Sequence, residues 1–222
     1  MKLTAVKAAN AARWSKMHIR ADKLASFHEI AARLCAPDAK ARFQGVTDRL
    51  IELKLQPVPW WVIAVIAERE YGGPPHWDRQ LGQGDPLNKK STHVPKGRGP
   101  FLSQPDDVTP GHDAWTRCAV DALVNCDPFA AKNADWSVGG VLTLLESFNG
   151  MGYAMRNVPS AYVWSGTDQY ISGKFVKDHV YRKNVVDIQE GCAPILVAMA
   201  AIDPSVRVGA PLDDSRPGAL VA

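Results

Sequence analysis

Residues 59–71 read PWWVIAVIAEREY and decide the fold of this chain. Proline suits the first turn of a helix, as Pro59 would be, and the eight residues after it are all apolar. A helix that is apolar on almost every side is buried inside a protein. The pair Gly72-Gly73 then stops the helix. The stretch therefore predicts a buried helix on which the other elements pack.

The rest of the chain predicts further helices around this centre. Apolar residues recur at spacings of three to four, which is typical of helices with one buried face. Residues 76–112 contain many Gly, Pro, Asp and Lys and predict a loop-rich lobe instead. The predicted fold class is therefore mainly α. The expected helices cover residues 1–55 with a break at Pro37-Asp38, 113–126, 135–148 and 193–201.

Composition and charge bound the class of protein. With 222 residues, 46% hydrophobic and 22% charged, the chain is an ordinary globular protein rather than a disordered, collagenous or membrane-embedded one. Residues 1–54 hold 11 Lys/Arg against 5 Asp/Glu, whereas the remainder holds 15 against 18. A basic head of this kind suggests an anionic partner, such as nucleic acid, a membrane surface or a wall polymer. Alternatively these helices pack on the rest of the chain, because Trp14 and Phe27 need burial.

Glu70 is the candidate for acid–base chemistry. At 100° per residue it lies within about 20° of Ile63, so it continues the apolar face, whereas Glu68 leaves that face. A carboxyl that is half desolvated at the negative end of a helix should have a raised pKa. A general acid near neutral pH needs such a pKa. The structural alternative is a solvated ion pair with Arg69 or Arg98.

Five motifs then follow one another along the chain. They are the helix ending in Arg69-Glu70, GDPL at 84–87, THVPKGR at 92–98, NGMGY at 149–153 and YVWSG at 162–166. Their types and order resemble the lysozyme-like peptidoglycan hydrolases, which include phage endolysins, goose-type lysozymes and lytic transglycosylases. The resemblance covers about residues 55–202. Several dispersed motifs in order are more specific than any one of them.

The resemblance implies a lysozyme-like fold in which a small irregular or β lobe, at about 76–105, forms one wall of a substrate cleft. It implies a muramidase that cleaves the β-1,4 bond between N-acetylmuramic acid and N-acetylglucosamine. Glu70 would be the catalytic acid, and no cofactor would be required. Tyr71 stands where those enzymes usually carry a Ser. We expect that its hydroxyl could replace the serine in supporting Glu70.

The sequence leaves the identity of the second catalytic group undecided. Phage-type lysozymes place Glu, Asp and Thr in an order that Glu70, Asp85 and Thr92 follow with longer spacing. An inverting hydrolase needs such a second carboxylate to activate water. Asp78 is an alternative, and Gly-Asp-Pro is also an ordinary turn. If Glu70 acts alone, the resemblance implies a lytic transglycosylase that releases 1,6-anhydro sugars.

Residues 149–170 offer the mixture that binds oligosaccharides. Aromatic rings can pack on sugar faces, while amides and hydroxyls bond sugar hydroxyls. Tyr153 and Trp164 are the leading candidates, against the alternative that they belong to an ordinary core. The full candidate set is Asn149, Tyr153, Tyr162, Trp164, Gln169 and Tyr170.

The partner expected from the resemblance is bacterial peptidoglycan, bound by a monomer. A non-catalytic wall-binding protein is the rival outside enzymes, and nucleic-acid binding lacks a recognisable motif. No metal is expected, because the His and Cys spacings match no zinc site. We expect no signal peptide, because the first residues lack an unbroken apolar run, and we expect no apolar run to span a bilayer. We therefore expect synthesis in the host cytoplasm and holin-dependent access to the wall. The expected division is a basic segment 1–54, a catalytic domain 55–202 and a tail 203–222.

Overall fold

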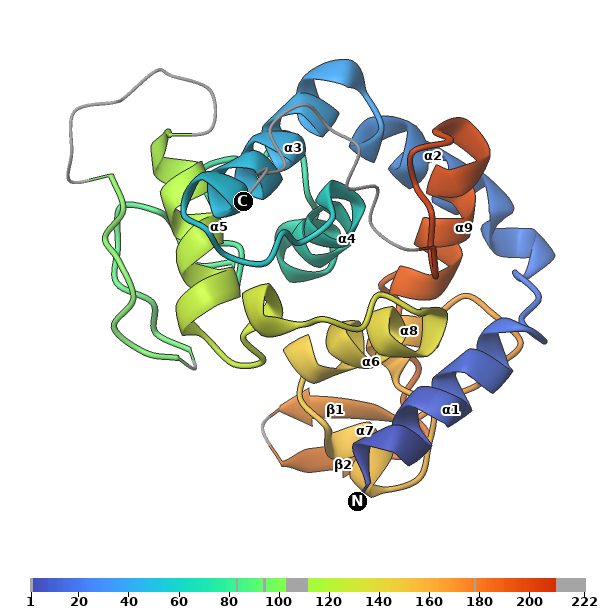
Figure 1. Cartoon of the computed structure of the whole chain (residues 1–222). Coiled ribbons are helices and arrows are strands. Elements are labelled where there is room, and N and C mark those ends of the chain that lie inside the picture. Colours follow the sequence, from blue (N-terminus) through green and yellow to red (C-terminus); the bar gives the residue numbers. More distant parts are fainter. Residues whose placement is uncertain (1, 83, 94, 103–111, 178, 211–222) are drawn as a thin grey trace.

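The fold is mainly α, as predicted. The structure, a computed structural model, describes residues 2–82, 84–93, 95–102, 112–177 and 179–210. Nine α-helices and two short strands, with two 3-10 turns between them, make up the described part (Figure 1). In chain order they are α1 (Leu3–Trp14), η1 (Ala21–Lys23), α2 (Leu24–Leu34), α3 (Pro37–Glu52), α4 (Trp60–Tyr71), α5 (Ala114–Asn125), η2 (Ala130–Lys132), α6 (Val138–Phe148), α7 (Gly152–Met155), α8 (Ala161–Trp164), β1 (Lys174–Lys177), β2 (Val180–Arg182) and α9 (Cys192–Ile202).

Helix α4 is the buried centre that the sequence predicted. All eight residues from Trp60 to Ala67 are buried, and the helix packs against α3, α6 and α9. It stops at Gly72, whose φ of +85° is left-handed and therefore favours glycine. The amides of Gly72 and Gly73 bond the carbonyls of Glu68 and Ala67, which satisfies the end of the helix. The position of Glu70 in the last turn follows directly from these two signals.

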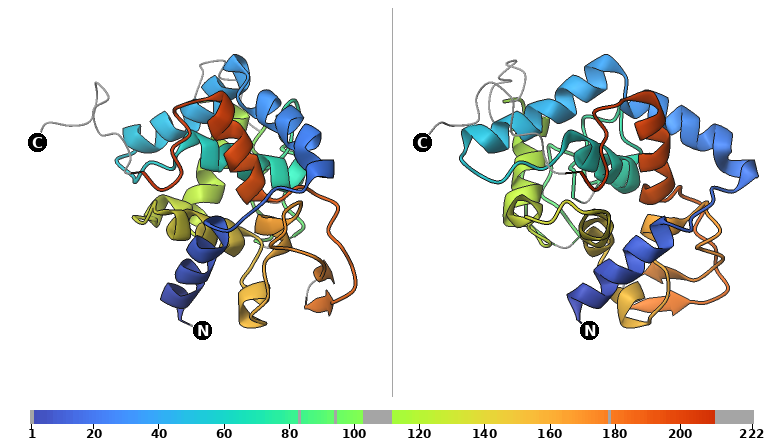
Figure 2. Two further views of the ribbon diagram at one scale, coloured as in Figure 1. Left: turned by 90° about the vertical axis from the view of Figure 1, so that its right-hand side faces the viewer. Right: turned by 45° about the vertical axis from the view of Figure 1, so that its right-hand side comes forward.

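The N-terminal helices are part of the same packed body. Helix α1 lies on α6, α2 on α9, and α3 on α4 and α5 (Figures 1 and 2). Their apolar residues, among them Phe27 and Phe43, are buried in the common core. Five cations of this segment form ion pairs with carboxylates of the remainder: Lys7–Asp135, Lys23–Glu190, Arg33–Glu68, Lys40–Asp203 and Arg42–Asp113. Much of the basic head is thus neutralised within the chain itself.

The lobe that was expected to be irregular or β is irregular in the residues that the structure describes. Within the described residues of 76–102, turns surround one isolated antiparallel bridge, between Arg79 and Pro86. Trp77 fixes this lobe to the core. The centroid of its ring lies 5.3 Å from the ring centroid of Phe43 and 4.9 Å from that of Trp115. The two-stranded antiparallel sheet lies instead in β1 and β2, beside α7 (Figure 1). The Gly- and Pro-rich sequence of the lobe supplies turns rather than strands.

The tail expected from residue 203 is packed as far as residue 210. Val206 is buried, and Asp203 pairs with Lys40 of α3. Residues 211–222 lie outside the described part. In that described part, no helix is both long and apolar enough to cross a membrane.

Candidate active site

Glu70 lies at the end of α4 with its carboxyl largely withdrawn from water. Burial raises its pKa from 4.5 to about 7, although a hydrogen bond from Tyr162 and the charge of Arg69 act in the opposite direction. The hydroxyl of Tyr162 donates to Glu70 Oε1 at 3.0 Å. The ion-pair alternatives are not formed, because Arg69 pairs with Asp187 and Arg98 with Asp121. Glu70 therefore combines partial burial with a pKa suited to donating a proton near pH 7.

Tyr162 comes from α8 and is held by a buried ionic network. The Arg69 guanidinium lies 4.6 Å from the centre of its ring. Arg69 Nη2 reaches Asp187 Oδ2 at 3.1 Å, with each side chain 4% exposed, and Lys174 Nζ reaches Asp187 Oδ1 at 2.7 Å. Burial opposes ionisation of Asp187, but the bonds from Lys174 and Arg69 hold its pKa below the usual range. The network fixes the ring whose hydroxyl contacts Glu70.

Tyr71 does not take the supporting role expected from its position after Glu70. Its hydroxyl accepts a hydrogen bond from Trp115 Nε1 at 3.1 Å, and burial raises its pKa strongly. Consecutive helical residues point about 100° apart, so Tyr71 faces α5 while Glu70 faces α8. The hydroxyl that reaches Glu70 belongs to Tyr162, ninety-two residues further along the chain.

Asp85 and Thr92 are in direct hydrogen-bond contact. Asp85 Oδ2 accepts from the Thr92 amide at 2.9 Å, and Oδ1 accepts from Thr92 Oγ1 at 3.2 Å. His93 Nδ1 lies 3.4 Å from Asp85 Oδ2. Burial opposes ionisation, but these contacts hold the pKa of Asp85 below its usual range. Asp85 is thus kept as a carboxylate, with Thr92 beside it.

The Asp85 loop lies against the end of α4. Gly84 has a φ of +65°, and a Cβ at that position would stand 2.8 Å from the carbonyl oxygen of Glu70. A side chain would clash there, so the GDPL turn needs its glycine. The rival carboxylate, Asp78, is 71% exposed and pairs with its neighbour Arg79 at 3.7 Å. The geometry therefore favours Asp85 over Asp78 as the carboxylate that accompanies Glu70.

Three of the expected sugar-binding aromatic residues are core residues, which corrects the prediction. Trp164 is completely buried and has no ring face to offer. Tyr153 is buried against Phe175 and Tyr181, with its hydroxyl accepting from the Phe175 amide. Tyr170 is buried, and its hydroxyl donates to the carbonyl of Gly173. The aromatic residues of this segment fill the core between short elements together with Ala161 and Val163, which are also fully buried.

The other three candidates differ in their burial and in their contacts. Tyr162 is also buried, but it touches Glu70 and so belongs to the site. Asn149 is exposed at the C-terminal cap of α6. Gln169 is half-buried, and its amide nitrogen donates to Asp168 at 3.0 Å. Asn149 and Gln169 are thus partly open to solvent and stay candidates for contact with a glycan.

Several residues of the site were missed from the sequence. Arg69 and Asp187 are 118 residues apart and carry no local motif. His93 stands next to Thr92, so the THVP segment offered a signal for it. Among the described residues, no group of three or more His, Cys, Asp or Glu is placed to hold a metal ion.

Comparison of the chain with protein-family models, with curated proteins and with solved structures finds no match. The likeness to lysozyme-like hydrolases therefore rests on the motifs of the chain itself.

Proposed function

We propose that the protein is a lysozyme-like muramidase that hydrolyses the β-1,4 bond between N-acetylmuramic acid and N-acetylglucosamine in peptidoglycan. The observation that carries the proposal is the state of Glu70. It ends the buried central helix, burial raises its pKa to about 7, and a fixed tyrosine hydroxyl orients it. Such a carboxyl is protonated for a useful fraction of the time at neutral pH, as a general acid must be.

The chemistry divides between two carboxyl groups with opposite pKa shifts. Glu70 donates its proton to the glycosidic oxygen as the bond to C1 breaks. Asp85, ionised and bonded to Thr92, accepts a proton from the water that attacks C1. Both groups then exchange protons with solvent and return to their starting states. A raised and a lowered pKa on neighbouring elements are the usual signature of such a pair.

One observation favours a lytic transglycosylase as the second candidate. The hydrogen bonds of the Asp85 carboxylate come from Thr92 and His93 of its own loop, which also suits a structural turn. In that case Glu70 acts alone. It protonates the glycosidic oxygen and then takes the proton of the substrate's 6-hydroxyl as that hydroxyl attacks C1.

Product analysis on purified murein in ¹⁸O-labelled water tests both candidates. A hydrolase adds one water and leaves ¹⁸O at the new reducing end, whereas a transglycosylase gives unlabelled products lighter by one water. The Glu70→Gln variant should give neither product. Protein that sediments with murein but releases no soluble sugar would refute both enzymes and leave a wall-binding protein.

A further inference from the structure

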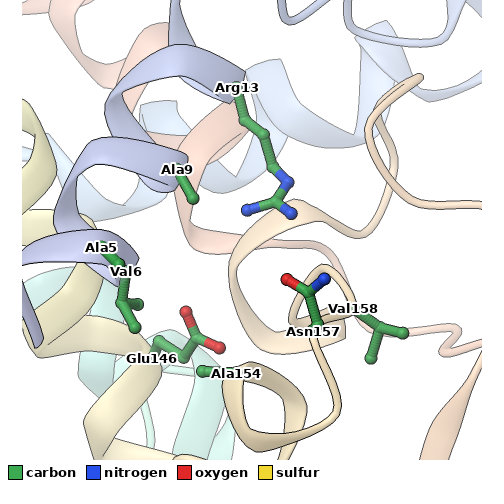
Figure 3. Close-up of a pocket in the computed structure, with 8 residues that line it drawn as sticks. All are labelled: Ala5, Val6, Ala9, Arg13, Glu146, Ala154, Asn157 and Val158. Carbon is green, nitrogen blue, oxygen red and sulfur yellow. The ribbon is translucent and has the colours of Figure 1, made fainter. Parts of the chain in front are cut away.

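A cavity between α1 and the α6–α7 segment forms a second candidate site. Its volume is about 110 Å³, and none of its lining residues belongs to the Glu70 site. Figure 3 shows the Glu146 carboxylate and the Arg13 guanidinium reaching toward the same space from opposite sides. Side chains of α1 and the segment after α7 complete the wall. A cavity with a negative group on one side and a positive group on the other is complementary to a ligand that carries both a positive and a negative charge.

Glu146 supplies the negative side. It is 2% exposed, and Asn10 Nδ2 donates to its Oε2 at 3.1 Å. Burial raises the pKa of Glu146, while the bond from Asn10, the charge of Arg13 and the Ala154 amide favour its carboxylate. A carboxylate accepts about four hydrogen bonds, so two of its acceptor positions stay free for a ligand. The remaining acceptor positions can take hydrogen bonds from a ligand in the cavity that Glu146 lines.

Arg13 supplies the positive side. It lies in the last turn of α1 and is half-buried, and its charge acts on the Glu146 carboxyl across the cavity. Because Arg13 lines the cavity, its N–H donors can bind a carboxylate there in the two-pronged geometry that arginine favours. The Asn157 side chain lines the same cavity and adds an amide.

The size and the walls limit the ligand further. An apolar cavity of about 150 Å³ holds benzene, which has six heavy atoms, so 110 Å³ suits a molecule of about four to six. Val6, Ala9 and Val158 make the rest of the wall apolar. A ligand with only a negative charge would be repelled by the Glu146 carboxylate. A ligand with only a positive charge would be repelled by the Arg13 guanidinium. A zwitterion with a very small aliphatic side chain satisfies every part of the lining.

We propose that this cavity binds a free small α-amino acid, of the size of glycine or alanine, with its ammonium on Glu146 and its carboxylate on Arg13. The ligand would bridge α1 to the α6–α7 segment. Binding of this kind stabilises the folded protein by mass action, so it also ties the docking of α1 to the ligand. The proposal does not depend on the activity of Glu70.

Calorimetric titration of the full chain with glycine and alanine tests the proposal, with ethylamine and propionate as probes that keep one charge each. We expect a Kd of about 1 mM for the amino acids, a range suited to so few atoms, and at least tenfold weaker binding of the two probes. Absence of amino-acid binding, which would leave a water-filled cavity, overturns the proposal. Equal binding of propionate overturns it too.

Matched variants locate the binding. Ala9→Leu fills the cavity and should abolish binding, while Ala8→Leu on the exposed face of α1 should preserve it. Arg13→Gln should weaken binding at least tenfold, and the exposed Lys16→Gln should not. Circular dichroism checks that each variant is folded. Equal affinities of the Ala9→Leu and Ala8→Leu proteins would place any binding elsewhere and refute the assignment.

Discussion

The Glu70→Gln substitution should make the protein more stable at alkaline pH while it removes the proposed acid. Burial raises the pKa of Glu70 from 4.5 to about 7, so the charged form is disfavoured in the folded state. Each pKa unit corresponds to about 1.4 kcal/mol, so a shift of this size amounts to about 3 kcal/mol. Glutamine carries no charge, and its amide oxygen can still accept the hydrogen bond from Tyr162.

The direction in which stability changes with pH follows from proton binding to Glu70. Between about pH 4.5 and 7 the folded protein keeps a proton on Glu70 that the unfolded chain has lost. The wild type therefore loses stability as the pH rises through this window, and the full penalty is present above it. Glu70→Gln should match the wild type near pH 4.5 and exceed its free energy of unfolding by up to about 3 kcal/mol near pH 8.

Urea unfolding at these two pH values measures the effect. Glu68→Gln is the matched control, because Glu68 lies two residues away and its Oε1 accepts from Arg33 at 2.9 Å. Loss of that ion pair should give no gain in stability at either pH. If Glu70→Gln shows no larger advantage near pH 8 than near pH 4.5, the carboxyl is not held neutral by burial and the reasoning for a general acid fails.

Three further outcomes are expected. Tyr162→Phe removes a hydroxyl that lowers the pKa of Glu70, so the alkaline limb of the pH–rate profile should move above the wild-type position near 7; an unmoved limb contradicts the contact. Asp85→Asn should slow release of hydrolysed product by about 10²–10⁴, with Asp78→Asn close to wild type; equal rates for both variants would remove Asp85 from the mechanism. Trp164→Ala should reduce the free energy of unfolding, measured in urea, by about 3–5 kcal/mol and leave the murein affinity of the folded fraction unchanged. A loss of affinity without a loss of stability would return Trp164 to the binding surface.

The central helix could be predicted because its signals are local. An unbroken apolar run predicts burial, and a glycine with positive φ fixes the end beside Glu70. The lobe at 76–105 was harder, because turn-forming residues do not tell an irregular loop from a short hairpin. The strands at 174–182 were not predicted, since each has only three or four residues.

The site residues also fall into those that local sequence predicts and those that tertiary contacts decide. Glu70 follows from helix periodicity, and the Asp85–Thr92 pair follows from the resemblance of the motifs. The hydroxyl on Glu70 comes from Tyr162 rather than the adjacent Tyr71, because a tertiary contact decides it. Composition also could not separate binding aromatics from core aromatics such as Trp164, since both are apolar and both occur near polar residues.

The basic head shows the limit of charge counting. Net charge describes a segment without its partners, and here carboxylates of the same chain pair with Lys7, Lys23, Arg33, Lys40 and Arg42. An excess of positive charge in one part of a sequence can therefore mark an internal interface as well as an external one.

The most direct test of Glu70 as a glycosidase acid is the release of reducing sugar or anhydro-sugar ends from purified murein by the wild type and by Glu70→Gln. Both proteins are first shown to be folded by urea unfolding. We expect soluble fragments from the wild type and none above background from Glu70→Gln. Equal release by the two proteins would contradict the assignment of Glu70 as the catalytic acid.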